Sequence, residues 1–301
     1  MGGELGEGAY TIKEAAERAG ATPELLRAWE RRYGVPLPKR SASGHRLYSE
    51  EDIRAVRWIR KKTDWGIEVR RAVELFKGSG SVPGAQASLE AARYTILDHL
   101  LAGEEGKAGA VLETAVSGHG IEAVCVEIVE PVLVLVGELW HRGVIGVAHE
   151  HWITESLKSV LIRLLAEEKK AGPEGVRVIV GCAPEELHEM GLLMLALFLA
   201  RRGLDVLYLG QAVPLEDLGV FAGGFGAQAV FLSASQKPRA KRMLGELPQF
   251  EAASGARAFI GGLAFEDESL RKAAGERFLG PGVREAADAA VELLLRETQI
   301  G

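Results

Sequence analysis

The spacing of hydrophobic and polar positions changes along the chain and predicts three regions. Over residues 1–77, and again over 87–172, apolar residues recur every three or four positions, as on one face of an α-helix. From residue 173 to 301, short apolar runs alternate with helical segments, which indicates a βα repeat. Residues 78–86, GSGSVPGAQ, predict a flexible linker. We therefore expect a multidomain chain of α and α/β domains.

The first region predicts short helices with clear start and stop signals. Thr11 caps the first helix and Gly20 ends it, while Thr22 caps the second. Ser49 caps a third helix, and a fourth begins near Val69. The tight turn between the first two helices is typical of a helix-turn-helix.

The second of these helices has the two faces of a recognition helix. Leu26, Trp29 and Tyr33 share an apolar face, and the opposite face is polar and basic. After it, residues 36–48, PLPKRSASGHRLY, predict a hairpin wing with cationic flanks. Arginine can bind guanine through two hydrogen bonds or clamp a phosphate. The candidate DNA-contacting residues are Glu24, Arg27, Arg31, Arg32, Lys39, Arg40, His45, Arg46 and Tyr48.

Charge supports contact with nucleic acid at one end of the chain. The net charge is −6, yet residues 1–77 hold 16 basic and 12 acidic side chains, against 20 and 30 in the remainder. From residue 23 to 62 the count is 11 basic to 5 acidic. A basic module on an acidic body favours nucleic-acid binding, although a solvated surface could carry the same charges.

The quoted residues of the first region resemble the winged helix-turn-helix of the MerR family. YTIKEAAERAGATPELLRAWERRYG with PLPKRSASGHRLYSEEDI matches that family's pattern from about Tyr10 to Phe76. The resemblance implies a dimer on a two-fold operator, with the recognition helix in the major groove and the wing on flanking phosphates. Many members end in a coiled-coil dimerisation helix. This chain continues into further domains, so part of its dimer contacts must lie elsewhere.

The middle region predicts helices joined by short turns, which favours an antiparallel four-helix bundle. Turns fall at Gly103, at 118–120 and at 142–146. Pro131 lies inside the third helix, where it removes a backbone hydrogen bond and is expected to kink the helix.

The last region predicts a Rossmann-like (flavodoxin-like) parallel sheet with helices on both faces. Ligands of such sheets bind outside the carboxyl ends of the strands. The segment APEELHEMG (183–191) follows the first apolar run, so a helix is expected to start near Pro184 with His188 in or near its first turn. The predicted strands are VRVIVG (176–181), DVLYLG (205–210), AVFLSA (229–234) and ARAFIGG (256–262), with a short RFLG (277–280) last.

His188 is a candidate metal ligand at that edge. The positive end of a helix disfavours the imidazolium, so a neutral ring would be free to bind a metal. Glu186 could accept from the other ring N–H and fix the tautomer. Glu189 has no role beyond the helix dipole. Taken alone, His188 would more often be a polar residue in the first turn of a helix, beside acids that suit the dipole.

A zinc site is a poor fit. His149 and His151 lie about 200° apart on a regular helix and cannot coordinate the same ion. The cysteines, Cys125 and Cys182, form no CxxC pair. A metal that arrives already chelated and needs one protein ligand fits better.

The location expected from the sequence is the cytoplasm, with no membrane partner. No apolar run reaches about 18 residues without a charge. The N-terminal segment lacks a basic-then-apolar signal pattern. Two distant cysteines fit a reducing compartment.

The spacing around His188 resembles the cobalamin-binding motif DxHxxG…SxL…GG. The resemblance implies that His188 replaces dimethylbenzimidazole as the lower cobalt ligand. The nucleotide tail would then enter the α/β domain beside a serine, where the glycines let its backbone approach closely. Two residues depart from the pattern: Glu186 replaces Asp, and Ser235 replaces Leu, which could loosen the tail pocket. The matching positions are Glu186, His188, Gly191, Ser233, Ser235, Gly261 and Gly262.

A second pattern, Trp140 followed after nine residues by Glu150-His151, resembles the CarH (LitR) photoreceptors, which are MerR-type repressors that hold adenosylcobalamin. There the three residues cover the 5′-deoxyadenosyl group. The resemblance makes His141 the candidate to bind cobalt from above after light removes that group. Taken singly, Trp140 could be a bundle-core aromatic, and Glu150 with His151 a capping pair. The role of His149 stays open.

These resemblances, in family order over the whole chain, imply a light-responsive repressor and not an enzyme. Adenosylcobalamin would be the chromophore. A homo-oligomer, expected to be a tetramer, would hold operator DNA in the dark and release it on Co–C photolysis. Two alternatives stay open. One is a regulator that senses cobalamin or another tetrapyrrole without light. The other is a corrinoid methyl-carrier protein, for which a winged domain has no use.

Overall fold

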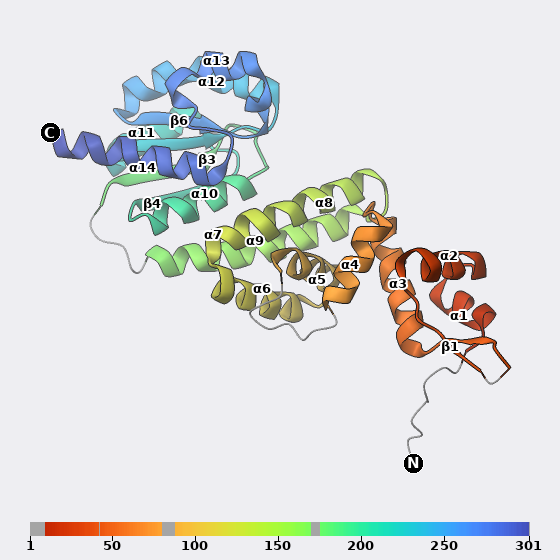
Figure 1. The fold of residues 1–301 in the computed structure, drawn as a ribbon. Helices are drawn as coiled ribbons and strands as arrows, with labels where there is room; N and C mark the ends of the chain where they lie inside the picture. The colour runs from red at the N-terminus through yellow and green to blue at the C-terminus, as the bar shows by residue number, and fades with distance from the viewer. Residues whose placement is uncertain (1–9, 42, 80–87, 170–174, 301) are drawn as a thin grey trace. The chain divides into compact units, whose positions relative to one another are not determined.

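The computed structural model describes residues 10–41, 43–79, 88–169 and 175–300 (Figure 1). The chain divides into two compact units: residues 1–120 with 134–147, and residues 121–133 with 148–301. The predicted linker at 78–86 falls mostly outside the described residues, and its first two positions belong to helix α4. None of the helices described is long and apolar enough to cross a membrane.

The N-terminal domain is built as the capping signals predict. Thr11 and Ser49 form capping boxes, Thr22 caps the second helix, and Gly20 ends the first in the left-handed conformation. Two short antiparallel strands form the wing between the second and third helices. The elements are α1 (Ile12–Ala19), α2 (Pro23–Tyr33), β1 (Lys39–Arg40), β2 (Arg46–Leu47), α3 (Glu50–Asp64) and α4 (Val69–Ser79).

The middle region is helical, as expected, but its third helix is not regular. A five-residue π segment, Cys125–Val129, ends two residues before Pro131, and the N–H of Glu130, which follows the segment, donates to the carbonyl of Cys125. Proline supplies no N–H, so the hydrogen-bond pattern changes at this point. The elements are α5 (Leu89–Leu101), which packs on α6 (Glu105–His119), then α7 (Ile121–Val124), η1 (Cys125–Val129), α8 (Glu130–His141) and α9 (Val147–Lys169).

The C-terminal region is a parallel sheet in the order β4-β3-β5-β6. Phe278, in the RFLG segment, adds a single parallel bridge to Ile260 of β6. This order is flavodoxin-like, and its direction reverses between β3 and β5, so the crevice for a ligand is expected at their carboxyl ends. The strands are β3 (Arg177–Cys182), β4 (Asp205–Gly210), β5 (Ala229–Ser233) and β6 (Arg257–Gly261).

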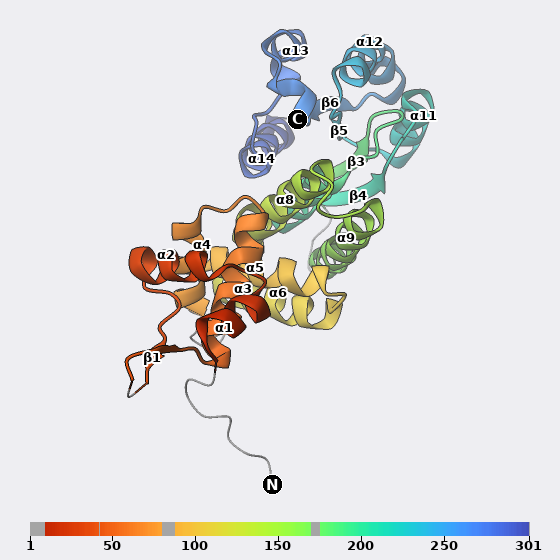
Figure 2. The ribbon, with the colours of Figure 1, turned by 90° about the vertical axis from the view of Figure 1, so that its right-hand side faces the viewer.

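Helices cover both faces of this sheet, as Figures 1 and 2 show. One pair, α10 and α14, packs together on one face, and α11 packs on α12 on the other. The apolar side chains of β3, β5 and β6 are almost fully buried between these layers, whereas most of those of the edge strand β4 are partly exposed. The covering elements are α10 (Met190–Arg201), α11 (Leu215–Phe225), α12 (Lys237–Ser254), η2 (Leu263–Glu266), α13 (Glu268–Ala274), η3 (Gly275–Arg277) and α14 (Val283–Ile300).

Candidate cofactor site and nucleic-acid interface

His188 lies in a loop and not in the first turn of a helix. The helix that follows β3 begins at Met190, so the predicted start near Pro184 is wrong. Glu185 adopts a φ of 64°, which a helix cannot accommodate. The loop folds back because the side chain of Glu186 is fully buried and accepts from the backbone N–H of His188.

The Glu186 carboxylate holds this loop to the end of β5. Its Oε1 accepts from the His188 backbone N–H at 2.9 Å and lies 2.7 Å from His188 Nδ1. Its Oε2 accepts from both the backbone N–H and the hydroxyl of Ser235, each at 2.7 Å. Arg239 on α12 adds an ion pair at 3.3 Å. The loop after β3 and the loop after β5 thus meet at the predicted crevice.

This network keeps Glu186 charged. Burial raises the pKa of the carboxyl group, but the hydrogen bonds from His188 and Ser235 outweigh it and lower the pKa to about 2. A charged acceptor at Nδ1 favours the tautomer with the proton on that nitrogen. The His188 side chain is 70% exposed, so its Nε2 is available to a ligand.

Ser235 was predicted in the cofactor site without its contact to Glu186, and Arg239 was not predicted. Ser235 was expected to loosen a tail pocket, yet it hydrogen-bonds Glu186, and its hydroxyl lies 3.0 Å from His188 Nδ1. Arg239 had no motif signal. Both follow β5 by a few residues, and only the sheet order brings them beside the loop after β3.

A cavity of about 240 Å³ opens beside the same sheet edge. A Cβ on Gly191 or Gly261 would meet no atom within 4 Å, so these glycines leave space in front of the sheet. Gly262 differs: with a φ of 100°, a Cβ there would lie 2.5 Å from the carbonyl oxygen of Ala234. The lining includes Gly191, Leu195, Phe231, Ser233, Gly261 and Gly262.

The donor set fits a metal that brings its own equatorial ligands. His188 offers one oriented ring nitrogen beside a cavity with apolar walls. Within the described residues, no group of three or more His, Cys, Asp or Glu side chains could hold a bare ion. Cys125 and Cys182 are buried, and burial raises the pKa of each thiol to about 12. Both thiols are therefore protonated at neutral pH in the protein without a metal.

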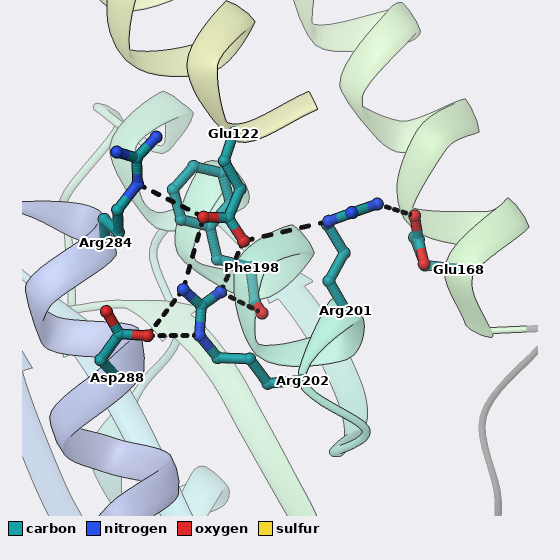
Figure 3. A network of polar contacts seen from close by, with 7 residues as sticks. All are labelled: Glu122, Glu168, Phe198, Arg201, Arg202, Arg284 and Asp288. Atoms are coloured by element: carbon teal, nitrogen blue, oxygen red, sulfur yellow. Dashed lines mark hydrogen bonds and ion pairs between the residues drawn. The ribbon is translucent and has the colours of Figure 1, made fainter. Parts of the chain in front are cut away.

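Two ion pairs place α9 alongside α10. Lys158 on α9 lies 2.6 Å from Glu189, which caps α10 at its start. Further along both helices, Glu168 pairs with Arg201 near the end of α10 (Figure 3). The two helices therefore run in the same direction. Because α10 starts at the carboxyl edge of the sheet, the residues of α9 before Lys158 extend beyond that edge.

A larger ion network secures the end of α10, as Figure 3 shows. The guanidinium of Arg202 lies 2.7 Å from Glu122 of α7 and 2.7 Å from Asp288 of α14. Arg284 adds a second contact to Glu122 at 3.3 Å. These contacts hold α7 and α14 to α10 at the end remote from His188.

The predicted covering residues occupy the ends of α8 and α9. On α9, His151 Nδ1 bonds the carboxylate of Glu150, which also accepts from Thr154 at 3.1 Å. In the other unit, Trp140 and His141 are the last two residues of α8. Trp140 is 48% exposed, so the alternative of a bundle-core aromatic is not supported.

Most predicted DNA-contacting side chains are exposed on α2 and the wing. Arg27 is half exposed and pairs loosely with Glu24 at 3.8 Å. Arg46 instead ties the wing to α2, because its Nε lies 2.7 Å from Glu30. Tyr48 is fully buried in the core of the domain, a placement that does not support its predicted DNA contact. The exposed members are Glu24, Arg27, Arg31, Arg32, Lys39, Arg40 and His45.

Comparison with known proteins matches two regions of the chain to family models. Residues 10–79 match the model of the MerR HTH family regulatory protein, and residues 93–165 match that of the B12 binding domain. The HTH-type transcriptional repressor CarH of Myxococcus xanthus is 36% identical over 228 residues, which cover 71% of this chain and 75% of that protein. The repressor CarA of the same organism is 32% identical over 209 residues, or 69% of this chain and 70% of that protein.

A solved structure shares its fold with about two thirds of this chain. The monomethylamine corrinoid protein of Methanosarcina barkeri superposes with a TM-score of 0.54 and 17% identity. The superposition covers 66% of this chain and 96% of that protein. At this identity the likeness concerns the fold alone.

The fold and its matched domains define a MerR-type regulator with a B12-binding module. The chain belongs to the family of CarH- and CarA-type transcriptional repressors. Gene regulation, and not catalysis, is the role of this family.

Proposed function

We propose that this chain is a light-responsive repressor that uses adenosylcobalamin as its chromophore. The observation that carries the proposal is the His188 site. A single exposed imidazole, oriented through Nδ1 by the buried Glu186, stands at the sheet's topological switch point beside a cavity. One nitrogen ligand with an adjoining cavity suits a corrinoid with a nucleotide tail.

The residues around the site have distinct roles in this proposal. His188 Nε2 would bind cobalt from below, and Glu186 with Ser235 would hold the ring in position. The cavity beside Ser233, Gly191 and Gly261 would receive the tail. Bound adenosylcobalamin would supply a cobalt–carbon bond that light can cleave.

The upper face would be covered by side chains from α8 and α9. Glu150 and His151 lie on the part of α9 that extends beyond the sheet edge. The motif resemblance assigns Trp140 to shield a bulky upper group and makes the adjacent His141 the candidate upper ligand once that group has left. We propose that this exchange of ligands alters the assembly that holds operator DNA.

The test is an absorption spectrum of the protein with adenosylcobalamin, recorded before and after green light. The expected result is a histidine-bound spectrum in the dark that changes irreversibly on illumination. His188→Ala should lose the histidine-bound spectrum, while its far-ultraviolet circular dichroism and melting temperature should match the wild type without cofactor and so show that it is folded. An unchanged dark spectrum in this variant would refute the assignment of His188.

The alternatives predict different outcomes in the same experiment. A cobalamin sensor without a light response would give the histidine-bound spectrum but keep its DNA affinity after illumination. A methyl carrier would turn over methylcobalamin with an acceptor. The exposed basic face of α2 favours the regulator over the carrier.

A further inference from the structure

Glu189, the residue after His188, is a buried carboxylate with partners on two other elements. Glu189 is 4% exposed, and its carboxylate accepts a hydrogen bond from the Tyr208 hydroxyl on β4. Lys158 Nζ on α9 lies 2.6 Å from its other oxygen. We call these three residues the Glu189 cluster. A buried carboxylate is costly unless its oxygens are partnered, so losing either contact would disturb the cluster.

The backbone around the cluster is shaped to admit it. Gly210, at the end of β4, has a φ of 80°, and a Cβ there would lie 3.3 Å from a carboxylate oxygen of Glu189. Glu189 also immediately precedes α10, so its main chain is held between the ligand loop and the first turn of that helix. Its position is therefore coupled directly to that of His188.

The other end of the cluster belongs to the helix that carries the covering pair. Glu150 precedes Lys158 by eight residues on α9, a helix rise of about 12 Å. The Glu168–Arg201 pair keeps the rest of α9 parallel to α10. The Lys158–Glu189 contact therefore sets how far Glu150 and His151 stand beyond the level of His188.

We propose that Lys158 is a positioning residue that acts through Glu189 to select the size of the cofactor's upper ligand. The inference rests on the proposed function and deepens it. A space of fixed height cannot collapse around a small upper ligand, so a small ligand would leave a void that costs binding free energy. A bulky adenosyl group would fill it. Without the Lys158–Glu189 contact, the first turns of α9 lose this fixed height and the preference weakens.

The test compares affinities for adenosylcobalamin and hydroxocobalamin, titrated in the dark and followed by absorption. Lys158→Met keeps the apolar stem of the side chain and removes its charge. We expect the preference for adenosylcobalamin to fall about tenfold, within the range for directly coupled residues. Glu155→Gln is the matched control. It removes the more exposed partner of Lys158, at 3.5 Å, and leaves Glu189 paired, so the preference should be unchanged.

A second readout uses the protein without cofactor. Amide hydrogen exchange over residues 148–157 should be faster in Lys158→Met than in the wild type or in Glu155→Gln, because one anchor of α9 is gone. Tyr208→Phe leaves both charges in place and should give a smaller change of the same kind. It serves as the variant of choice if Lys158→Met does not fold.

The outcomes separate this inference from the proposed function. A wild-type protein that binds no cobalamin would overturn both. If the wild type shows the histidine-bound spectrum and Lys158→Met has the same preference for adenosylcobalamin as the wild type, only the role of Lys158 is overturned. A lower melting temperature with an unchanged preference would likewise reduce Lys158 to a structural contact.

Discussion

At the scale of single residues, the Glu186 carboxylate holds the orientation of the His188 ring. Its pKa of about 2 lies below the ordinary 4.5, because the donors from His188 and Ser235 outweigh the effect of burial. A depressed carboxyl pKa contributes stability above about pH 4.5, and this is lost as the pH falls toward about 2. The ring orientation should therefore persist throughout the neutral and mildly acidic range.

Gly261, the last residue of β6, and Gly262, the residue after it, should respond differently to replacement by alanine. Gly262→Ala forces a Cβ within 2.5 Å of the Ala234 carbonyl oxygen at a φ of 100°, so we expect a loss of stability of at least about 2 kcal/mol. Gly261→Ala meets no atom within 4 Å and should fold normally. Urea unfolding of both variants measures the difference.

Gly261→Ala also tests the proposed tail pocket. Gly261 lines the cavity, so a methyl group there should weaken cobalamin binding without loss of stability. If Gly261→Ala binds cobalamin as the wild type does, the tail does not pass this glycine. The two outcomes can be read independently because stability and binding are measured separately.

Residue roles were predictable only where their signal is local in sequence. Glu186 was expected to accept from the ring of His188, two positions away, and its Oε1 lies 2.7 Å from His188 Nδ1. Glu189 was assigned nothing beyond the helix dipole, because its partners Lys158 and Tyr208 lie far away in the chain. A carboxylate that neighbours a candidate ligand gives no sign of such partners until the sheet and helices are assembled.

At the scale of elements, the recognition helix makes a direct prediction. Arg27→Ala and Arg31→Ala should each weaken operator binding by about 1–3 kcal/mol and reduce the salt dependence of binding by about one counterion. Fluorescence anisotropy at several salt concentrations measures both. Lys107→Ala, which removes an exposed lysine from α6, is the control. Unaltered operator affinity in the arginine variants would show that α2 is not the recognition helix.

The contact between α3 and α5 depends on a buried lysine. Lys62 is fully buried, with Nζ 2.6 Å from Asp98 and 3.7 Å from the ring centroid of Trp65. Burial lowers its pKa to about 8, and the attraction of Asp98 limits the shift. We expect Lys62→Ala to destabilise this unit by about 3 kcal/mol, through the lost pair and the lost packing.

The pH dependence of this contact has a definite sign. Between about pH 8 and 10.5 the unfolded chain holds the Lys62 proton more tightly than the folded one, so stability should rise with pH. The rise should be absent from Lys62→Ala. Thermal unfolding of both proteins across this range measures it, and parallel profiles would exclude Lys62 as the titrating group.

Helix boundaries show where local rules succeed and where they fail. In the N-terminal domain, the caps at Thr11, Thr22 and Ser49 begin helices as predicted, because each cap acts on its own next turn. The start of α10 was misplaced by six residues, since Pro184 is equally suited to a loop. The buried Glu186 decides in favour of the loop, through Ser235 on another element.

At the scale of the whole molecule, the proposed function requires assembly that depends on light. The winged region carries a net charge of +4 and the remainder −10, so the acidic remainder opposes DNA binding by a single copy. Several winged domains on one operator would overcome this through multivalency. We expect the loaded protein to elute from gel filtration as a larger species in the dark than after green light.

Two controls sharpen this measurement. His188→Ala, mixed with adenosylcobalamin, should elute identically before and after illumination. Hydroxocobalamin, which lacks the adenosyl group, should give the illuminated elution volume without light. An elution volume of the wild type that light leaves unchanged would remove the switch from the proposed function.

The sequence by itself determined the domain order, the helix caps, the strand runs and the spaced motif around His188, because each depends on neighbouring residues or on periodicity. Tertiary structure alone decided which loops meet at the sheet's switch point. It placed Ser235 and Arg239 on Glu186, buried Tyr48, and brought Lys158 to Glu189. These contacts join residues distant in the chain, and their partners are selected by sheet order and helix packing, which local patterns do not encode.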